Sequence, residues 1–191
     1  MELATIADLR SVLSLQASDT SHDVFIEAAA AAAEDWMLKA LRSSGTFEAD
    51  EQSFDEYLAG NGKSFLSLPA FPVTEITSVH TVDDDGAEEL IDDEEYRSDR
   101  FTLWRLTGYG TWPEGVKNIH VVWKAEWSTA ELAAFKTLLF KIVGFEFMNQ
   151  SSSRWGERSR STEGLSQSWM TNAEFLADIE SVLRRYRRPI V

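Results

Sequence analysis

Residues 60–64 read Gly-Asn-Gly-Lys-Ser, residue types that hold phosphate groups in nucleotide-binding loops. That mechanism needs Gly-x-x-x-x-Gly-Lys-Ser at the start of a helix, whose N-terminal N–H groups stabilise the anion. Tyr57 stands where the first glycine is required, and residues 65–69 have the pattern of a strand. We therefore expect a tight turn here and no bound nucleotide.

No spacing typical of a metal site or an active site stands out. Acidic residues crowd positions 83–99, but a calcium-binding EF-hand loop with its glycine at Gly86 would need an Asp where Thr81 stands. Cysteine is absent, which removes thiolate ligands and thiol nucleophiles. The three histidines lack the His-x-x-x-His spacing that places two ligands on one helical face. We expect a solvated acidic loop, and neither catalytic residues, nor a cofactor, nor a metal ion.

A dense basic cluster occupies residues 184–191. It comprises Arg184, Arg185, Tyr186, Arg187, Arg188, Pro189, Ile190 and Val191. Cations near the negative end of a helix dipole contribute about 0.3–1 kcal/mol each, which accounts for one or two of these arginines but not for the others or for the apolar tail. Because arginine pairs bidentately with carboxylates, we predict that this segment docks on an acidic partner.

A second basic group lies in residues 149–170, a polar stretch that is rich in Ser and Arg and lacks periodicity. Its candidate contact residues are Arg154, Trp155, Arg158 and Arg160. A structureless loop of this length is uncommon in a compact domain and is usually functional or disordered until bound. We predict that these residues contact a partner.

The net charge of −14, from 18 basic and 32 acidic residues, makes the protein as a whole repel nucleic acid. The first residues lack the basic and apolar regions of a secretory signal, so we expect a cytosolic protein. Residues 133–148 are the most apolar stretch, but Lys136, Lys141 and Glu146 point in separate directions around a helix, and we expect no membrane span.

The helices and strands that the sequence pattern indicates predict an α+β fold. We expect a helical bundle core with a small β-rich insertion and a C-terminal helix with a basic tail. A single domain would divide into N-terminal helices at 1–58, the β-rich insertion at 59–127, a long apolar helix at 128–148, a Ser/Arg loop at 149–170, and the C-terminal helix and tail at 171–191. Capping boxes at 5–8 and 128–131 mark two helix starts. β-Branched residues at 73–82 and a turn at 83–86 indicate a strand and hairpin.

The long helix is apolar on most sides, which favours burial by more than one neighbour. We predict that six of its residues pack between subunits: Leu132, Phe135, Leu138, Leu139, Ile142 and Phe147.

Four segments together resemble the head-tail connector, or adaptor, proteins of tailed phages, a family also found in gene transfer agents and prophages. They are residues 60–69, 72–79 and 112–121 and the terminal Tyr186-Arg187-Arg188, in the order of that family. Two departures are the sequence Ala125-Glu126-Trp127, where the family often has an Ala-Gly-Tyr-like strand end, and the lack of a proline before the long helix.

The resemblance implies a structural subunit and not an enzyme. Its expected location is the virion neck, after assembly in the host cytoplasm. About twelve subunits would form a ring under the portal protein, with residues 184–191 inserted into the portal and a stopper or tail-completion protein bound below. DNA would pass through the channel without specific binding.

Two other functions fit parts of the sequence. A monomeric module could hold a ligand or carbohydrate between exposed Trp104, Trp112 and Trp123, although a Trp-rich core is an equal interpretation. A nucleic-acid binder could use the arginines of 149–170 and 184–191, against the overall charge.

Overall fold

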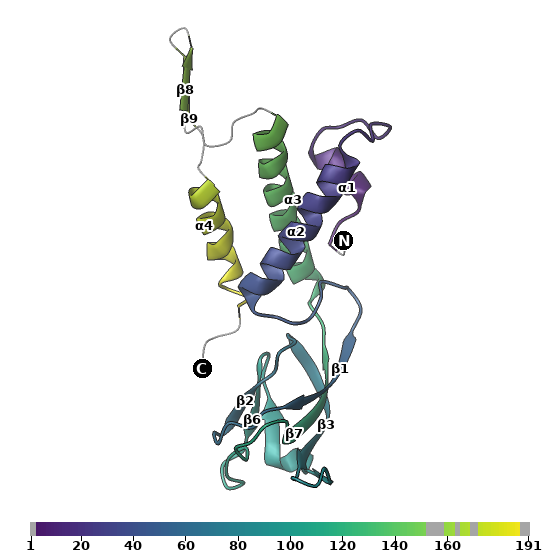
Figure 1. The fold of residues 1–191 in the computed structure, drawn as a ribbon, viewed down its shortest axis with the longest axis vertical. Coiled ribbons are helices and arrows are strands. Elements are labelled where there is room, and N and C mark those ends of the chain that lie inside the picture. Colours follow the sequence, from purple (N-terminus) through teal and green to yellow (C-terminus); the bar gives the residue numbers. More distant parts are fainter. Residues whose placement is uncertain (1–2, 152–158, 163–164, 169–171, 188–191) are drawn as a thin grey trace. The chain divides into compact units, whose positions relative to one another are not determined.

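The computed structural model describes residues 3–151, 159–162, 165–168 and 172–187 (Figure 1). The chain forms two compact units: a helical unit of Met1–Arg42 with Ala130–Val191, and a β unit of Ser43–Thr129. Together they give the predicted α+β fold, with the β unit inserted between helices. None of the helices in the described residues is both long and apolar enough to cross a membrane.

The helical unit contains α1 (Ile6–Val12), α2 (Asp23–Leu41), α3 (Thr129–Ser151) and α4 (Asn172–Leu183). The predicted capping box at α1 is confirmed, because Asp8 N donates to Thr5 Oγ1 over 3.2 Å and Thr5 N donates to Asp8 Oδ2 over 3.0 Å. Lys136 of α3 donates to the same carboxylate over 2.9 Å. The Lys136 ammonium and the Thr5 donors lower the pKa of Asp8, so the cap also ties α1 to α3.

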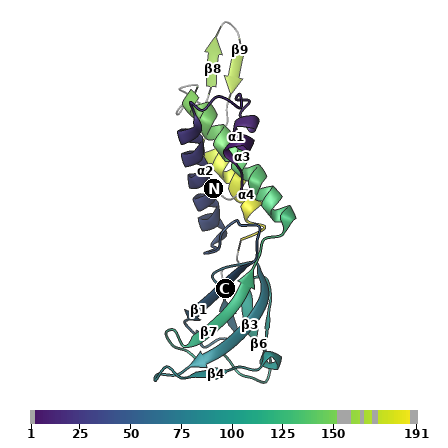
Figure 2. The same ribbon diagram turned by 90° about the vertical axis from the view of Figure 1, so that its right-hand side faces the viewer.

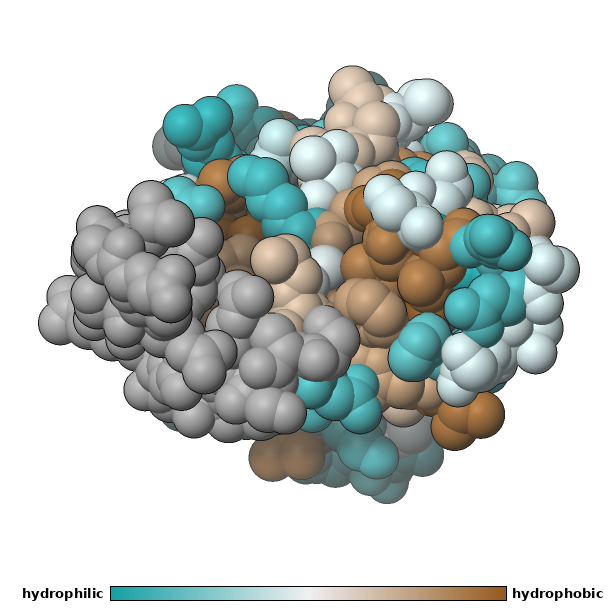
Figure 3. All heavy atoms as spheres, turned by 90° about the horizontal axis from the view of Figure 1, so that it is seen from above, coloured by the Kyte–Doolittle hydropathy of each residue, from teal (hydrophilic) through white to brown (hydrophobic). Residues whose placement is uncertain are grey.

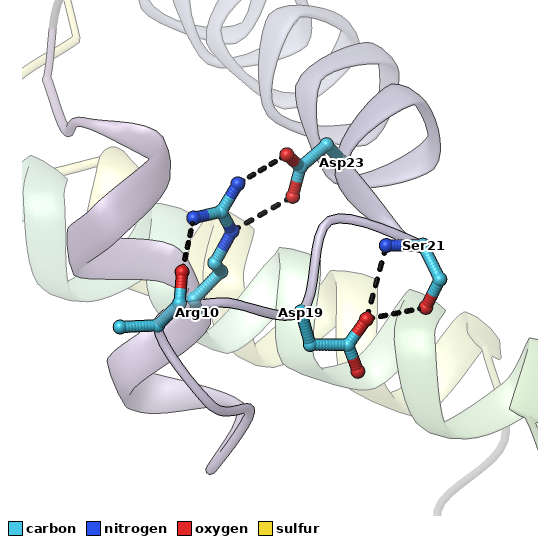
Figure 4. Close-up of polar contacts among 5 residues, drawn as sticks. Arg10, Asp19, Ser21 and Asp23 are labelled. Atoms are coloured by element: carbon cyan, nitrogen blue, oxygen red, sulfur yellow. Dashed lines mark hydrogen bonds and ion pairs between the residues drawn. The ribbon is translucent and has the colours of Figure 1, made fainter.

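Arg10 connects α1 to the start of α2 (Figure 4). Its guanidinium makes a two-bond pair with Asp23, with Nε to Oδ1 at 2.8 Å, and Nη1 donates to Ala17 O over 2.9 Å. Asp19 Oδ1 accepts hydrogen bonds from the backbone N and the hydroxyl of Ser21. The Asp23 carboxylate raises the pKa of Arg10. These contacts fix the connection between the two helices.

The core of the helical unit is apolar and includes small side chains that let helices approach closely. It contains Leu9, Ile26, Ala30, Ala33, Met37, Leu41, Phe135, Leu138, Leu139, Ile142, Val143, Ile179 and Leu183. The acidic side chain of Glu34 in α2 is also buried, and its Oε1 accepts a hydrogen bond from Leu3 N over 3.0 Å. That bond compensates part of the cost of burying a carboxylate and holds the start of the chain against α2.

The β unit consists of two antiparallel sheets (Figure 2). The larger has the order β1-β7-β3-β4, with bounds Gln52–Leu58, Ile119–Ala125, Val73–Val82 and Glu88–Leu90. The smaller has the order β2-β6-β5, with bounds Phe65–Ser67, Thr102–Arg105 and Tyr96–Ser98, and the 3-10 helix Asp93–Glu95 precedes β5. The predicted hairpin turn is confirmed, with Gly86 N bonded to Asp83 O and Gly86 at a φ of +80°.

Both sheets contribute to one hydrophobic core. Its members are Leu66, Leu68, Ala70, Val79, Ile91, Leu103, Trp112, Ile119, Val121, Trp123 and Ala125. Trp112 and Trp123 are fully buried, and their indole N–H groups donate to the backbone oxygens of Leu103 and Ala70. The hypothesis of a carbohydrate site between exposed indoles is therefore wrong for these two. Trp104 is half-buried and donates to Asp99 Oδ2 over 2.8 Å.

Two predicted boundaries are wrong. The N-terminal helical segment 1–58 ends in strand β1, where Phe54 and Leu58 lie on the half-buried face while charged Asp55 and Glu56 obscured the alternation. The Ser/Arg loop 149–170 begins with the last turn of α3 and contains the antiparallel hairpin of β8 (Ser159–Thr162) and β9 (Leu165–Ser168). Backbone pairing of such polar strands leaves no hydrophobic alternation in the sequence.

Replacing Leu103 by Ala should lower the free energy of unfolding of the β unit by about 2–5 kcal/mol, since this side chain is fully buried between the sheets. Leu90→Ala is the matched control in β4, where the leucine is 65% exposed; its effect should stay within about 0.5 kcal/mol. Urea denaturation monitored by tryptophan fluorescence measures both. Equal losses in the two variants would contradict the assigned core.

Candidate functional site

The C-terminal basic segment begins as a continuation of α4. Backbone bonds from Arg184 N to Glu180 O and from Tyr186 N to Leu183 O extend the helical turn. The ring of Tyr186 packs edge-on against Phe135 of α3, with centroids 5.1 Å apart. Arg187 Nη1 lies 3.9 Å from Glu180 Oε1. The aromatic contact therefore anchors the start of the segment to the helical unit.

Arg184 and Arg185 project into solvent from this anchored turn. Within the described part of the chain, no carboxylate lies at ion-pair distance from either guanidinium. They are available cations at a fixed place, which suits the predicted docking role. The rest of the predicted segment, residues 188–191, lies outside the described residues, as do Arg154, Trp155 and Arg158. Of Arg160 only the backbone, in β8, is described.

The predicted inter-subunit residues of α3 divide into two groups. Phe135, Leu138, Leu139 and Ile142 are buried within the helical unit of a single chain. Leu132 and Phe147 are only partly buried, and the Phe147 ring meets those of His22 and Phe25. The apolar residues of α3 are therefore buried largely by other helices of the same chain. A role of these residues in packing between subunits stays a prediction.

An open apolar groove of about 300 Å³ lies between α2, α3 and α4. Its lining residues are Phe25, Ala29, Ala32, Ala33, Trp36, Ile142, Glu146 and Leu176. Exposed apolar side chains elsewhere on these helices include Val24, which is 83% exposed, and Met148, which is 58% exposed. Figure 3 shows hydrophobic atoms reaching the surface among hydrophilic ones on one face of the molecule. The sequence analysis did not single out this groove.

Two of the segments that carry the family resemblance meet in the β unit. Gly60 N donates to Asn118 Oδ1 over 2.8 Å, Asn118 Nδ2 donates to Pro113 O over 3.0 Å, and Gly115 N donates to Gly60 O over 3.1 Å. A Cβ on Gly60 would lie 1.8 Å from Pro113 O. The turn at 60–62 leads into β2 and not into a helix, so its glycine serves close backbone packing, and the predicted tight turn is confirmed.

A polar cluster that sequence spacing did not reveal lies on the outward face of the larger sheet. His120 on β7 stands directly between Tyr57 on β1 and His80 on β3. The Tyr57 and His120 rings are stacked with centroids 4.3 Å apart, and His80 stacks on the other side at 5.5 Å. His120 Nε2 lies 2.7 Å from Asp55 Oδ1, and His120 Nδ1 lies 3.0 Å from Glu88 Oε2.

Hydrogen bonds and charges shift the titration of this cluster. Burial lowers the pKa of His120, but hydrogen bonds to Glu88 and Asp55 outweigh it, so the pKa is raised. Tyr57 donates its hydroxyl to Glu88 Oε1 over 2.6 Å. This bond and the one to His120 lower the pKa of Glu88, and the bond between Tyr57 and Glu88 raises the pKa of Tyr57. The cluster therefore concentrates negative charge around two imidazole rings.

Comparison with solved structures identifies the fold. The chain is similar to a chain in the neck of an empty gene transfer agent (GTA) particle computed with C6 symmetry, with a TM-score of 0.54, 15% identity, and coverage of 99% of this chain and 91% of that chain. It is also similar to a chain in the virion of a native GTA particle, with a TM-score of 0.58, 14% identity and the same coverage. No family model and no curated protein matches the sequence. The resemblance inferred from the ordered motifs is confirmed at the level of the fold.

Gly60→Ala should destabilise the β unit by about 1–3 kcal/mol, because a rigid backbone oxygen occupies the space that the methyl group needs. Gly45→Ala, in the same unit, is the control: its Cβ would meet only ordinary contacts from 3.4 Å outward. Thermal unfolding by circular dichroism compares the two. A Gly60→Ala midpoint as high as that of the control would refute the close packing of these turns.

Proposed function

We propose that this chain is a non-enzymatic structural subunit of the neck of a tailed phage or phage-like particle, a head-tail connector that forms a ring of about twelve copies under the portal. The observation that carries the proposal is the fold match over 99% of the chain to chains of GTA particles, one of them described as a particle neck. The ordered motifs of the sequence point independently to the same family. A stopper or tail-completion protein would bind the opposite face of the ring.

The helical unit offers a surface for a neighbouring copy. Four of the six α3 residues predicted to pack between subunits are already buried, so we assign the contact with a neighbouring copy to the apolar groove between α2, α3 and α4. The symmetric arrangement of the similar GTA neck favours a second copy of this chain as its occupant. The small side chains of Ala29 and Ala32 leave room for a helix or loop of that copy.

The C-terminal segment offers the surface for the portal. Arg184 and Arg185 are exposed on a turn that the Tyr186–Phe135 contact holds in place. Charge-assisted bonds from arginine to carboxylates are strong and directional, so an acidic surface of a portal is the complementary partner. The net charge of −14 suits a channel wall along which DNA moves without adhering.

Ala32→Arg should weaken self-assembly at least tenfold in concentration, since a charged side chain would occupy the apolar groove. Ala28→Arg is the matched control, because Ala28 is exposed on the same helix and does not line the groove. Native mass spectrometry and sedimentation velocity over a concentration series measure the distribution of oligomers. Unchanged assembly of Ala32→Arg would refute the groove as the interface between copies. The proposed role in the particle neck would then depend on whether the protein binds the portal.

Reversing the charge of Arg184 and Arg185 together, to Glu, should reduce binding to the portal protein of the same particle at least tenfold. The control is Lys39→Glu with Lys141→Glu, which makes the same charge change at exposed positions of the same unit. Charge reversal is preferable to truncation, because deletion of 184–191 also removes the Tyr186 contact. Co-sedimentation with purified portal measures binding. Wild-type affinity in the Arg184/Arg185 variant would refute the docking role.

A further inference from the structure

The outward face of β7 carries two nitrogen side chains, each held between two carboxylates. Lys124 Nζ lies 3.1 Å from Glu51 Oε1 and 2.9 Å from Glu75 Oε2. His120, four positions earlier, lies between Asp55 and Glu88. At Lys124 the ammonium group supplies the positive charge that the carboxylates require. At His120 an imidazole is neutral unless it takes up a proton or binds a cation.

The hydrogen bonds around His120 leave one nitrogen for such a cation. Nε2 lies 2.7 Å from Asp55 Oδ1; in the neutral tautomer that donates its hydrogen to this carboxylate, Nδ1 carries the lone pair. That lone pair faces Glu88 Oε2 at 3.0 Å, and two acceptors at this separation repel unless a positive charge lies between them. A carboxylate behind the imidazole is also the arrangement that orients metal-binding histidines.

The surroundings of His80 indicate which cation, a proton or a metal ion, suits the cluster around His120. A proton on His120 satisfies Asp55 and Glu88, but it gives nothing to His80, whose Nδ1 is buried without a hydrogen-bond partner. A ligand atom from each of His80, Glu88 and His120 lies within 4.8 Å of the other two. Around a tetrahedral zinc ion with bonds of about 2.0–2.1 Å, ligand atoms lie about 3.3 Å apart, so a small side-chain rotation closes the site.

We propose that His80, Glu88 and His120 bind a divalent transition-metal ion of the zinc class. Two imidazole nitrogens and one carboxylate oxygen are the donor set that such ions prefer over calcium or magnesium. Tyr57 holds the other oxygen of Glu88 through its hydroxyl at 2.6 Å, and Asp55 orients His120. The ion joins β3, β4 and β7, with a fourth position open to water. The site is independent of the neck role.

The experiment is zinc titration of the full-length protein after removal of metals with EDTA, followed by calorimetry. The wild type should bind one Zn²⁺ per chain, and Co²⁺ in its place should give the visible absorption of a tetrahedral complex. His80→Ala should weaken zinc binding at least about tenfold, as should Glu88→Gln, with Asp55→Asn losing about 10–100-fold through the orientation of His120. His22→Ala, a histidine of the helical unit, is the matched control and should bind as the wild type does.

Absence of zinc binding by the wild type would overturn the proposal. Equal affinity in a folded His80→Ala and in the control would do the same, because the ion would then lie elsewhere, and Glu88→Gln provides the second reading if His80→Ala fails to fold. Displacement of zinc by an equal concentration of Ca²⁺ would show binding to the acidic loop alone and would also refute the site.

Discussion

The register of β7 between β1 and β3 is the constraint on which the β unit depends. Buried and outward side chains alternate strictly along this strand, with Ile119, Val121 and Trp123 facing the core. The same pairing places His120 opposite Tyr57 and His80 on the outer face. Because the side-chain period of a strand is two, a slip by one residue would exchange the two faces. It would place an imidazole in the core and an indole in solvent, so the hydrophobic core enforces the geometry of the polar cluster.

Much of the local structure followed from sequence. The capping box at Thr5 and the hairpin turn at Gly86 both depend on contacts between residues a few positions apart, which pattern reasoning can follow. Strand β1 was missed because its burial is only partial and its sequence is charged. The hairpin of β8 and β9 was missed because backbone pairing alone leaves no apolar period.

The proposed functional surfaces were predictable only where their residues are contiguous in sequence. The basic turn at Arg184 and Arg185 was visible as a run of residues, whereas His80 and His120 become neighbours only through strand pairing over a separation of forty positions. The buried indoles of Trp112 and Trp123 could equally have been surface anchors, since composition does not report which way a side chain faces. Two of the motifs that carried the family resemblance, around Gly60 and Pro113, are hydrogen-bonded to each other through Asn118.

The two ends of the β unit come together. Gln52, near its beginning, pairs with Ala125, near its end, and Glu126 N bonds back to Pro72 O. To the helices on either side, this unit is therefore equivalent to a short connection, and the entropy of closing a loop rises only with the logarithm of its length. An insertion built in this way can be enlarged, exchanged for another module or excised with little consequence for the helices that flank it. The helical unit and the inserted β unit can therefore change in sequence and size largely independently of each other.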